Sequence, residues 1–117
     1  MDSKNELKIF HKETCITCKK AIAEIDRMKL DMEKRDFFKD PLSETELKKI
    51  IKMSGKSPSE LLRKRDKMFK ELDLENSRVA ESQIIKLMVK YPGLIMRPII
   101  ISGNKAFVGN IDSKILK

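Results

Sequence analysis

Residues 11–20 read HKETCITCKK, and the rest of the chain can be interpreted outward from this segment. It holds both cysteines, Cys15 and Cys18, and the single histidine, His11, of the 117 residues. An apolar strand is predicted over residues 7–10, and a helical pattern runs from residue 15 to about residue 29. A cysteine at such a junction sits at a helix N-terminus, where unpaired N–H groups and the helix dipole favour a thiolate. The segment therefore predicts thiol chemistry.

The spacing of the two cysteines predicts separate roles for them. Cys15 lies at the start of the helix, nearer to the dipole and to solvent, and is expected to be the nucleophile. Cys18 lies one turn further on, close enough to form a disulfide, and is expected to be the resolving thiol. Thr17 is expected to help shape the site, and the lysines that follow add positive charge. The alternative is that both cysteines are small buried hydrophobic residues.

Composition limits the classes to which the protein can belong. A length of 117 residues fits one domain, and 40% hydrophobic residues without Trp predict an aliphatic, Met-rich core. The polar opening predicts no secretory signal, and no apolar run approaches the roughly 20 residues of a membrane span. We therefore expect a cytoplasmic protein in a reducing compartment, where a C-x-x-C has a redox or metal role. Zinc would need two more ligands, and only His11 is available among Cys and His. Asp or Glu could complete the set, but such sites are uncommon, so no metal is expected.

The net charge of +8 comes largely from lysines spread along the chain among 18 acidic residues, which is typical of a solvated surface. Attraction to acidic partners or small oxyanions is the alternative. No helix-turn-helix or aromatic-basic surface is visible, so direct binding of nucleic acid is not expected.

Further elements follow along the chain. A second strand ending at residues 37–38 completes a βαβ unit with parallel strands. A capping box at Ser43 and Glu46 and a second helix start at Ser57 and Glu60 predict two helices, followed by a third over residues 78–91. Residues 97–101 and 105–108 form a predicted hairpin, residues 1–6 a frayed start, and residues 112–117 a helical turn or tail.

This order predicts an α/β fold of the thioredoxin-like kind. The βαβ unit and the ββ hairpin share one four-stranded mixed sheet, and the middle helices form an insertion at about residues 41–91. Residues 1–117 are thus expected to form a single domain.

Three arginines and a proline are further candidates for the site. Pro98 before an apolar strand tolerates a cis peptide bond. In the thioredoxin-like plan that bond lies against the C-x-x-C, so Arg97 would direct its planar guanidinium, which suits an oxyanion, toward Cys15. Arg63 and Arg65 lie early in the second predicted insertion helix and face different ways, so Arg63 is favoured as an anion ligand and Arg65 as a surface contact. Each arginine has the alternative of a solvated surface residue.

His11 precedes Cys15 by four residues. It could orient the loop that carries Cys15 or help to stabilise a thiolate. The alternative is a structural histidine that is simply hydrogen-bonded at a strand end.

These residues resemble the arsenate reductase family over nearly the whole chain. His11-x-x-x-Cys15 is similar to the strand end and nucleophile of the glutaredoxin-linked enzymes, and LLRK from Leu61 and RPI from Arg97 are similar to segments that supply two of three anion-binding arginines. The resemblance implies that Cys15 attacks arsenate or another small oxyanion. It also implies an external thiol reductant, glutathione with glutaredoxin or thioredoxin, and no bound cofactor. Val108 stands at the third arginine's position, and Cys18 where those enzymes usually carry serine.

Several segments are more similar to the Spx-like branch of that family: CITCKKA from Cys15, PLS from Pro41, RDKMF from Arg65 and YPGLIMRPIII from Tyr91. Members of that branch use the C-x-x-C as a redox switch and bind the α-subunit of RNA polymerase, and Arg65 matches an arginine linked to regulation at that contact. We therefore expect a thiol-dependent oxidoreductase with Cys15 as nucleophile and Cys18 as resolving cysteine, acting on an oxyanion such as arsenate or on a disulfide. The alternative is a redox-sensing regulator that binds the polymerase α-subunit.

Overall fold

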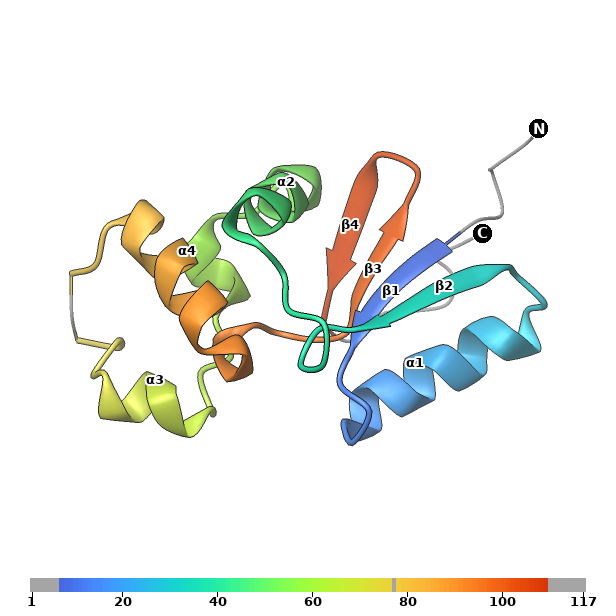
Figure 1. Ribbon diagram of the computed structural model, residues 1–117, viewed down its shortest axis with the longest axis horizontal. Helices are drawn as coiled ribbons and strands as arrows, with labels where there is room; N and C mark the ends of the chain where they lie inside the picture. The colour runs from blue at the N-terminus through green and yellow to red at the C-terminus, as the bar shows by residue number, and fades with distance from the viewer. Residues whose placement is uncertain (1–6, 77, 110–117) are drawn as a thin grey trace. The chain divides into compact units, whose positions relative to one another are not determined.

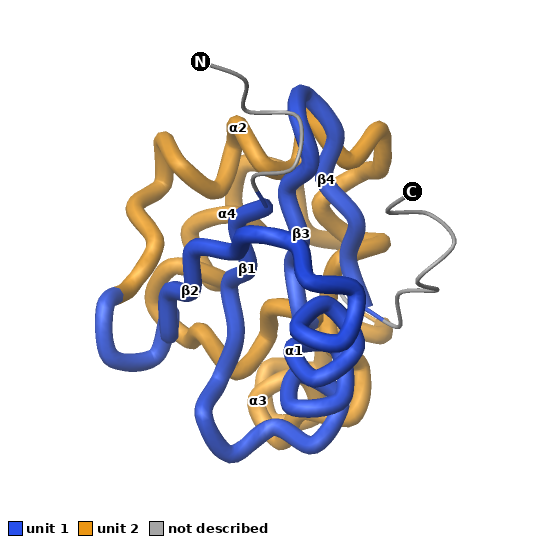
Figure 2. The backbone as a smooth tube through the Cα atoms, turned by 90° about the vertical axis from the view of Figure 1, so that its right-hand side faces the viewer, with its two compact units in different colours: residues 1–40, 97–117 blue, residues 41–96 orange. Residues whose placement is uncertain are grey.

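The structure, a computed structural model, describes residues 7–76 and 78–109. The predicted frayed start at residues 1–6 and the predicted turn or tail at residues 112–117 lie outside the described residues. The chain divides into two compact units, which Figure 2 colours separately. Residues 1–40 and 97–117 form the sheet unit, and residues 41–96 form the helical unit. The helical unit thus ends slightly later than the predicted insertion, and the single-domain assignment stays a prediction.

The sheet unit contains the predicted four-stranded mixed sheet (Figure 1). Its strands lie in the order β2-β1-β3-β4, with β1 parallel to β2 and the two other pairs antiparallel. The elements of the unit are β1 (Leu7–His11), α1 (Ile16–Arg27), β2 (Met32–Asp36), β3 (Ile99–Ser102) and β4 (Lys105–Val108). The turn between β3 and β4 contains Gly103 at φ +63°, a backbone conformation that favours glycine.

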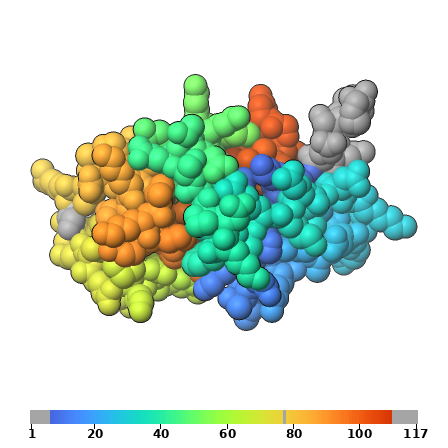
Figure 3. Space-filling model, viewed as in Figure 1, coloured from blue at the N-terminus to red at the C-terminus, as the bar shows by residue number. Residues whose placement is uncertain are grey.

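The position of each strand follows from its residues. β1 is bonded to a strand on either side, and its apolar residues Leu7, Ile9 and Phe10 are buried. β2 reads MEKRD, lies at the sheet edge and exposes its central Glu33 and Lys34. Charged side chains on an edge strand discourage pairing with another chain. In the space-filling view this segment, in cyan, forms part of the surface (Figure 3).

Helix α1 packs on one face of the sheet, as its apolar spacing predicts. Ile25 of the helix is buried in a cluster with Leu7, Ile9 and Ile100 of the strands. Further apolar side chains that pack against this cluster are Ala21, Ile22, Leu30 and Met32.

The helical unit is built from α2 (Glu44–Ser54), η1 (Pro58–Leu61), α3 (Lys67–Glu71), α4 (Glu81–Lys90) and η2 (Pro92–Leu94). The predicted capping box at Ser43 is confirmed, because its hydroxyl accepts from the Glu46 N–H and the Glu46 carboxylate accepts from the Ser43 N–H. Helix α4 contacts α2, η1 and η2. Within the described part of the chain, no helix combines the length and apolar character needed to cross a membrane.

The prediction that Arg63 and Arg65 lie on a helix is wrong. Only one 3₁₀ turn, η1, forms after Ser57, because Leu62 then makes a β-bridge with Ile95 and the Arg63 N–H donates to the Leu94 carbonyl at 2.7 Å. A new helix begins only at α3. The two arginines therefore lie in an extended and turning segment rather than on a helix.

Other element boundaries also differ from the predicted ones. Strand β2 ends at Asp36 and not at residues 37–38, which lie in a turn. Helix α4 begins at Glu81, after Ala80 as N-cap, and not at residue 78. Strand β3 begins at Ile99, because Pro98 has no N–H to contribute to the sheet.

Candidate redox site

Cys15 is the N-cap residue of α1, where the sequence places the nucleophile. Its backbone is extended, with φ −80° and ψ 119°, and its Sγ accepts a hydrogen bond from the Cys18 N–H at 3.3 Å. The loop before it is closed by a bond from the Cys15 N–H to the Lys12 carbonyl at 2.9 Å. The first turn of α1 contains no acidic residue. The sulfur thus takes the position of an N-cap oxygen at the positive end of the helix.

Cys18 lies one turn further along α1 and is fully buried, at 0% exposure. Burial and the neighbouring Cys15 sulfur raise the pKa of Cys18 to about 12, although the Lys12 backbone and the charge of Arg97 act in the opposite direction. Both cysteines are free thiols in the structure. Cys18 therefore stays protonated as long as Cys15 carries the negative charge.

The pKa of Cys15 moves in the opposite direction. Burial raises the pKa of Cys15, but hydrogen bonds from the Cys18 thiol, the Cys18 N–H and the Arg97 guanidinium together lower it below the ordinary value, and the charge of Arg97 adds to this. Hydrogen bonds and a nearby cation both favour the charged form of a thiol. The surroundings of Cys15 therefore favour a thiolate.

The sheet topology explains how Arg97 reaches Cys15. Phe10 of β1 lies opposite Ile99 of β3, and these two strands are antiparallel. The residues just before β3 therefore lie beside the end of β1, where the loop to Cys15 begins. The Arg97–Pro98 peptide bond is cis, as the sequence allowed, and Pro98 is fully buried.

His11 and Thr17 lie near this centre. His11 ends β1 and is partly buried, and its carbonyl accepts from the Phe37 N–H at 3.1 Å. Thr17 is partly buried in the first turn of α1, between the two cysteines. The structure places both residues beside Cys15 in the chain, and their roles at the site stay predictions.

Two residues that the sequence analysis did not single out also belong to this region. Asp36 accepts hydrogen bonds from the Glu13 N–H at 3.1 Å, the Phe38 N–H at 2.9 Å and the Lys39 N–H at 3.3 Å. Burial raises the pKa of Asp36, but these three bonds outweigh it and lower the pKa below its usual range. An aspartate at the end of a strand, just before a turn, is typical of such turns, and this pattern could have identified it.

Phe38 follows in the same turn. Its ring centroid lies 5.2 Å from the guanidinium carbon of Arg97. Phe38 is thus the aromatic contact of the arginine that bonds Cys15.

Arg63 and Arg65 belong to the helical unit. The Arg63 Nη1 lies 3.6 Å from Asp66 Oδ1, and the side chain is partly buried, whereas Arg65 is exposed. The structure describes both residues within their own unit, so the anion-binding role of Arg63 and the regulatory role of Arg65 stay predictions.

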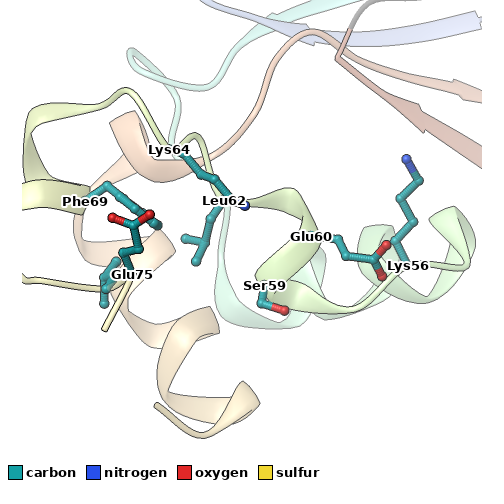
Figure 4. A pocket seen from close by; sticks show the side chains of 8 residues that line it. Lys56, Ser59, Glu60, Leu62, Lys64, Phe69 and Glu75 are labelled. Atoms are coloured by element: carbon teal, nitrogen blue, oxygen red, sulfur yellow. The ribbon is translucent and has the colours of Figure 1, made fainter. Parts of the chain in front are cut away.

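The helical unit has a cavity of about 470 Å³ of its own (Figure 4). Leu62 and Lys64, on either side of Arg63, contribute to its lining, with Phe69 beside them. Charged side chains from Lys56, Glu60 and Glu75 surround it. This mixture of charges selects neither an anion nor a cation.

Comparison with known proteins decides the family. The model of the ArsC family matches residues 10–117. The chain belongs to the ArsC family. The global transcriptional regulator Spx of Listeria innocua is 31% identical over 107 residues, which cover 92% of this chain and 82% of the relative. Spx of Bacillus subtilis is 29% identical over the same share of both chains. These relatives confirm the resemblance to the Spx-like branch.

Solved structures confirm the fold of this ArsC-family chain. The arsenate reductase from Vibrio cholerae matches with a TM-score of 0.87 at 22% identity, over 95% of each chain. An arsenate reductase (ArsC) related protein from Brucella melitensis matches with a TM-score of 0.74 at 24% identity, over 94% of this chain and 91% of that one. The family thus includes proteins named as regulators and proteins named as enzymes on one thioredoxin-like fold.

Proposed function

We propose that this protein is a thiol–disulfide oxidoreductase in which Cys15 is the nucleophile and Cys18 the resolving cysteine. The observation that carries the proposal is the contrast between the two sulfurs. Cys15 Sγ accepts the Cys18 N–H at the start of α1 and is bonded by Arg97, whereas Cys18 is fully buried one turn along. Cys15 is therefore suited to attack as a thiolate, and Cys18 is suited to attack the mixed disulfide that follows.

The reaction with a disulfide substrate has two steps. The Cys15 thiolate attacks one substrate sulfur, the substrate S–S bond breaks, and the departing thiolate takes up a proton. Cys18 then gives its proton to solvent and attacks Cys15 Sγ, which forms the Cys15–Cys18 disulfide and releases the second substrate thiol. Two electrons pass from the dithiol to the substrate. An external reductant, glutathione with glutaredoxin or thioredoxin, returns the pair to the dithiol.

Trapping with oxidised glutathione tests whether Cys15 is the nucleophile and Cys18 the resolving cysteine. The unaltered chain should lose two hydrogen masses as the internal disulfide forms, whereas Cys18→Ser should accumulate a stable glutathione adduct on Cys15. The matched variant Cys15→Ser should stay unmodified under the same conditions. A stable adduct on the unaltered chain, or an adduct on Cys18, would contradict the proposal.

A small oxyanion is a narrower substrate for the same nucleophile. In that case Arg97 would hold the anion while Cys15 attacks it. Arsenate turnover with glutathione and glutaredoxin, measured beside Arg97→Ala, checks this version. Turnover that disappears in the variant would support arsenate as substrate, and a lack of turnover in the unaltered chain would exclude it.

The names of the curated relatives favour a second candidate, a redox-sensing transcriptional regulator. The Cys15–Cys18 disulfide would then be the switch, and the exposed Arg65 would contact the α-subunit of RNA polymerase. Pull-down with that α-subunit, using reduced and oxidised protein and Arg65→Ala as control, separates the two candidates. Capture that depends on the redox state and on Arg65 would favour the regulator.

A further inference from the structure

Two cations lie close to the ring of Phe38. Arg97 Cζ is 5.2 Å from the ring centroid, and Lys12 Nζ is 4.7 Å from it. The ring also contacts Phe37, whose centroid is 5.0 Å away at a tilt of 53°. A cation within about 6 Å of an aromatic face is attracted by the ring's negative face, and arginine is the more frequent partner. The ring is therefore a platform for the guanidinium that bonds Cys15.

Asp36 fixes the backbone that carries this ring. Its Oδ1 accepts the Phe38 N–H, and its Oδ2 accepts the Glu13 N–H from the loop before Cys15. An ion pair between Lys39 and Glu13 joins the same two segments. The turn after β2 and the loop after β1 are thus held together at the position where Cys15 enters α1.

We propose that Phe38 is a positioning residue for the Cys15 nucleophile: its ring holds the Arg97 guanidinium within reach of the sulfur, and Asp36 holds the ring in place. This inference rests on the proposed thiolate chemistry of Cys15 and names a residue that acts on it through Arg97. The physical reason is the length of the arginine side chain. Several rotatable bonds separate its backbone from its charge, so a charge that must stay beside one sulfur needs a surface that restricts it.

The groups that act electrostatically on Cys15 come from two elements. Cys18 contributes from α1, and Arg97 contributes from the segment before β3. Phe38 carries no charge of its own, and of the two cations at its ring, Arg97 is the one that lowers the pKa of Cys15. The effect of Phe38 on Cys15 is therefore assigned to the position of Arg97. A double-mutant cycle can detect this indirect action.

The test measures alkylation of Cys15 by iodoacetamide against pH, with the adduct assigned by mass spectrometry. In Phe38→Leu the midpoint should move to higher pH, and the rate at neutral pH should fall about 3- to 10-fold, since a close cation commonly shifts a pKa by about one unit or more. Phe38→Tyr keeps a ring face and should restore the profile. Phe107→Leu, which removes a partly buried ring from β4, is the matched control and should leave the midpoint in place.

The cycle with Arg97→Met decides the mechanism. Once Arg97 is removed, Phe38→Leu should have no further effect on the midpoint. Shifts from Phe38→Leu and Arg97→Met that add up in the double variant would overturn this inference but not the proposed function. The same holds if the unaltered chain has a low midpoint that Phe38→Leu does not move. An ordinary midpoint in the unaltered chain would overturn the thiolate chemistry and this inference together. Circular dichroism checks folding, and Phe38→Met, a longer side chain without a ring, replaces the leucine variant if that one does not fold.

Discussion

Helices α1 and α2 begin with similar backbone geometry but with different chemistry. Cys15 and Ser43 are both extended N-cap residues, with φ −80° in each case. Ser43 Oγ accepts from the Glu46 N–H at 3.1 Å, and the Glu46 carboxylate accepts from the Ser43 N–H. Cys15 Sγ accepts from the Cys18 N–H at 3.3 Å, but the Cys15 N–H donates to the Lys12 carbonyl instead of to a carboxylate. The first turn of α2 carries Glu44 and Glu46, and the first turn of α1 carries no acidic residue.

The comparison shows how one position in a helix can serve two purposes. At α2 the carboxylates neutralise the positive end of the helix, and the result is stability. At α1 that positive end has no carboxylate partner in the first turn, so it remains available to the sulfur. We therefore expect the reactivity of Cys15 to depend on the absence of acidic residues from the first turn of α1 as well as on the residues present there.

The largest expected effect comes from making the first helix start like the second. Cys15→Ser should abolish formation of the internal disulfide and the adduct with glutathione. The free energy of unfolding should change by no more than about 1 kcal/mol, because serine is itself a preferred N-cap residue. Mass spectrometry and urea denaturation of the reduced protein measure the two results. A large loss of stability would show that the sulfur is chiefly structural.

A moderate effect is expected at the other helix. Ser43→Ala removes the cap of α2 and should lower the free energy of unfolding by about 1 kcal/mol. Urea denaturation measures this, with the exposed Ser82→Ala on α4 as a control that should change stability by less than about 0.5 kcal/mol. The alkylation profile of Cys15 should stay unchanged. A shift of that profile would show that the two helix starts do not act independently.

The smallest effect is expected from placing a carboxylate in the first turn of α1, where α2 has Glu44 and Glu46. Ile16 is 68% exposed at the first position of α1, so Ile16→Glu can be made without disturbing the core. The new carboxylate should compete with the thiolate for the helix dipole, raise the pKa of Cys15 and slow its alkylation at neutral pH about 2- to 5-fold. Ile16→Gln is the uncharged control, and high salt should diminish the difference. Equal rates for both variants at low salt would contradict a role for the dipole.

Features with a local cause were the ones that the sequence predicted well. The capping box at Ser43, the junction at Cys15 and the hairpin turn at Gly103 each depend on residues within a few positions of one another. The paired strands followed from their apolar pattern and from the rules for βαβ connections. The fold and the position of Cys15 at a helix start could therefore be predicted from the sequence.

Contacts between distant parts of the chain were not accessible in this way. The segment after η1 has capping residues and apolar spacing that suit a helix, but the bridge between Leu62 and Ile95 overrides this local preference. The contact between Phe38 and Arg97 likewise depends on two segments, one after β2 and one before β3, that come close only in the folded sheet, where β1 lies between these two strands. The predicted fold and Pro98 placed Arg97 at the site, and the family resemblance agreed, but periodicity alone could not supply its aromatic partner.

The complete burial of Cys18 has a consequence for oxidative damage. Under the proposed function, peroxide would reach Cys15 first and convert it to a sulfenic acid, with release of water. A second peroxide molecule could then drive the same sulfur to the irreversible sulfinic state. The Cys18 thiol lies one helical turn away in the same chain, so it would react with the sulfenic acid before a second peroxide molecule does. This reaction would form the Cys15–Cys18 disulfide and release a second water. Burial would thus protect the Cys18 thiol from peroxide until Cys15 is oxidised. Oxidation would then stop at the Cys15–Cys18 disulfide, which a cellular thiol can reduce.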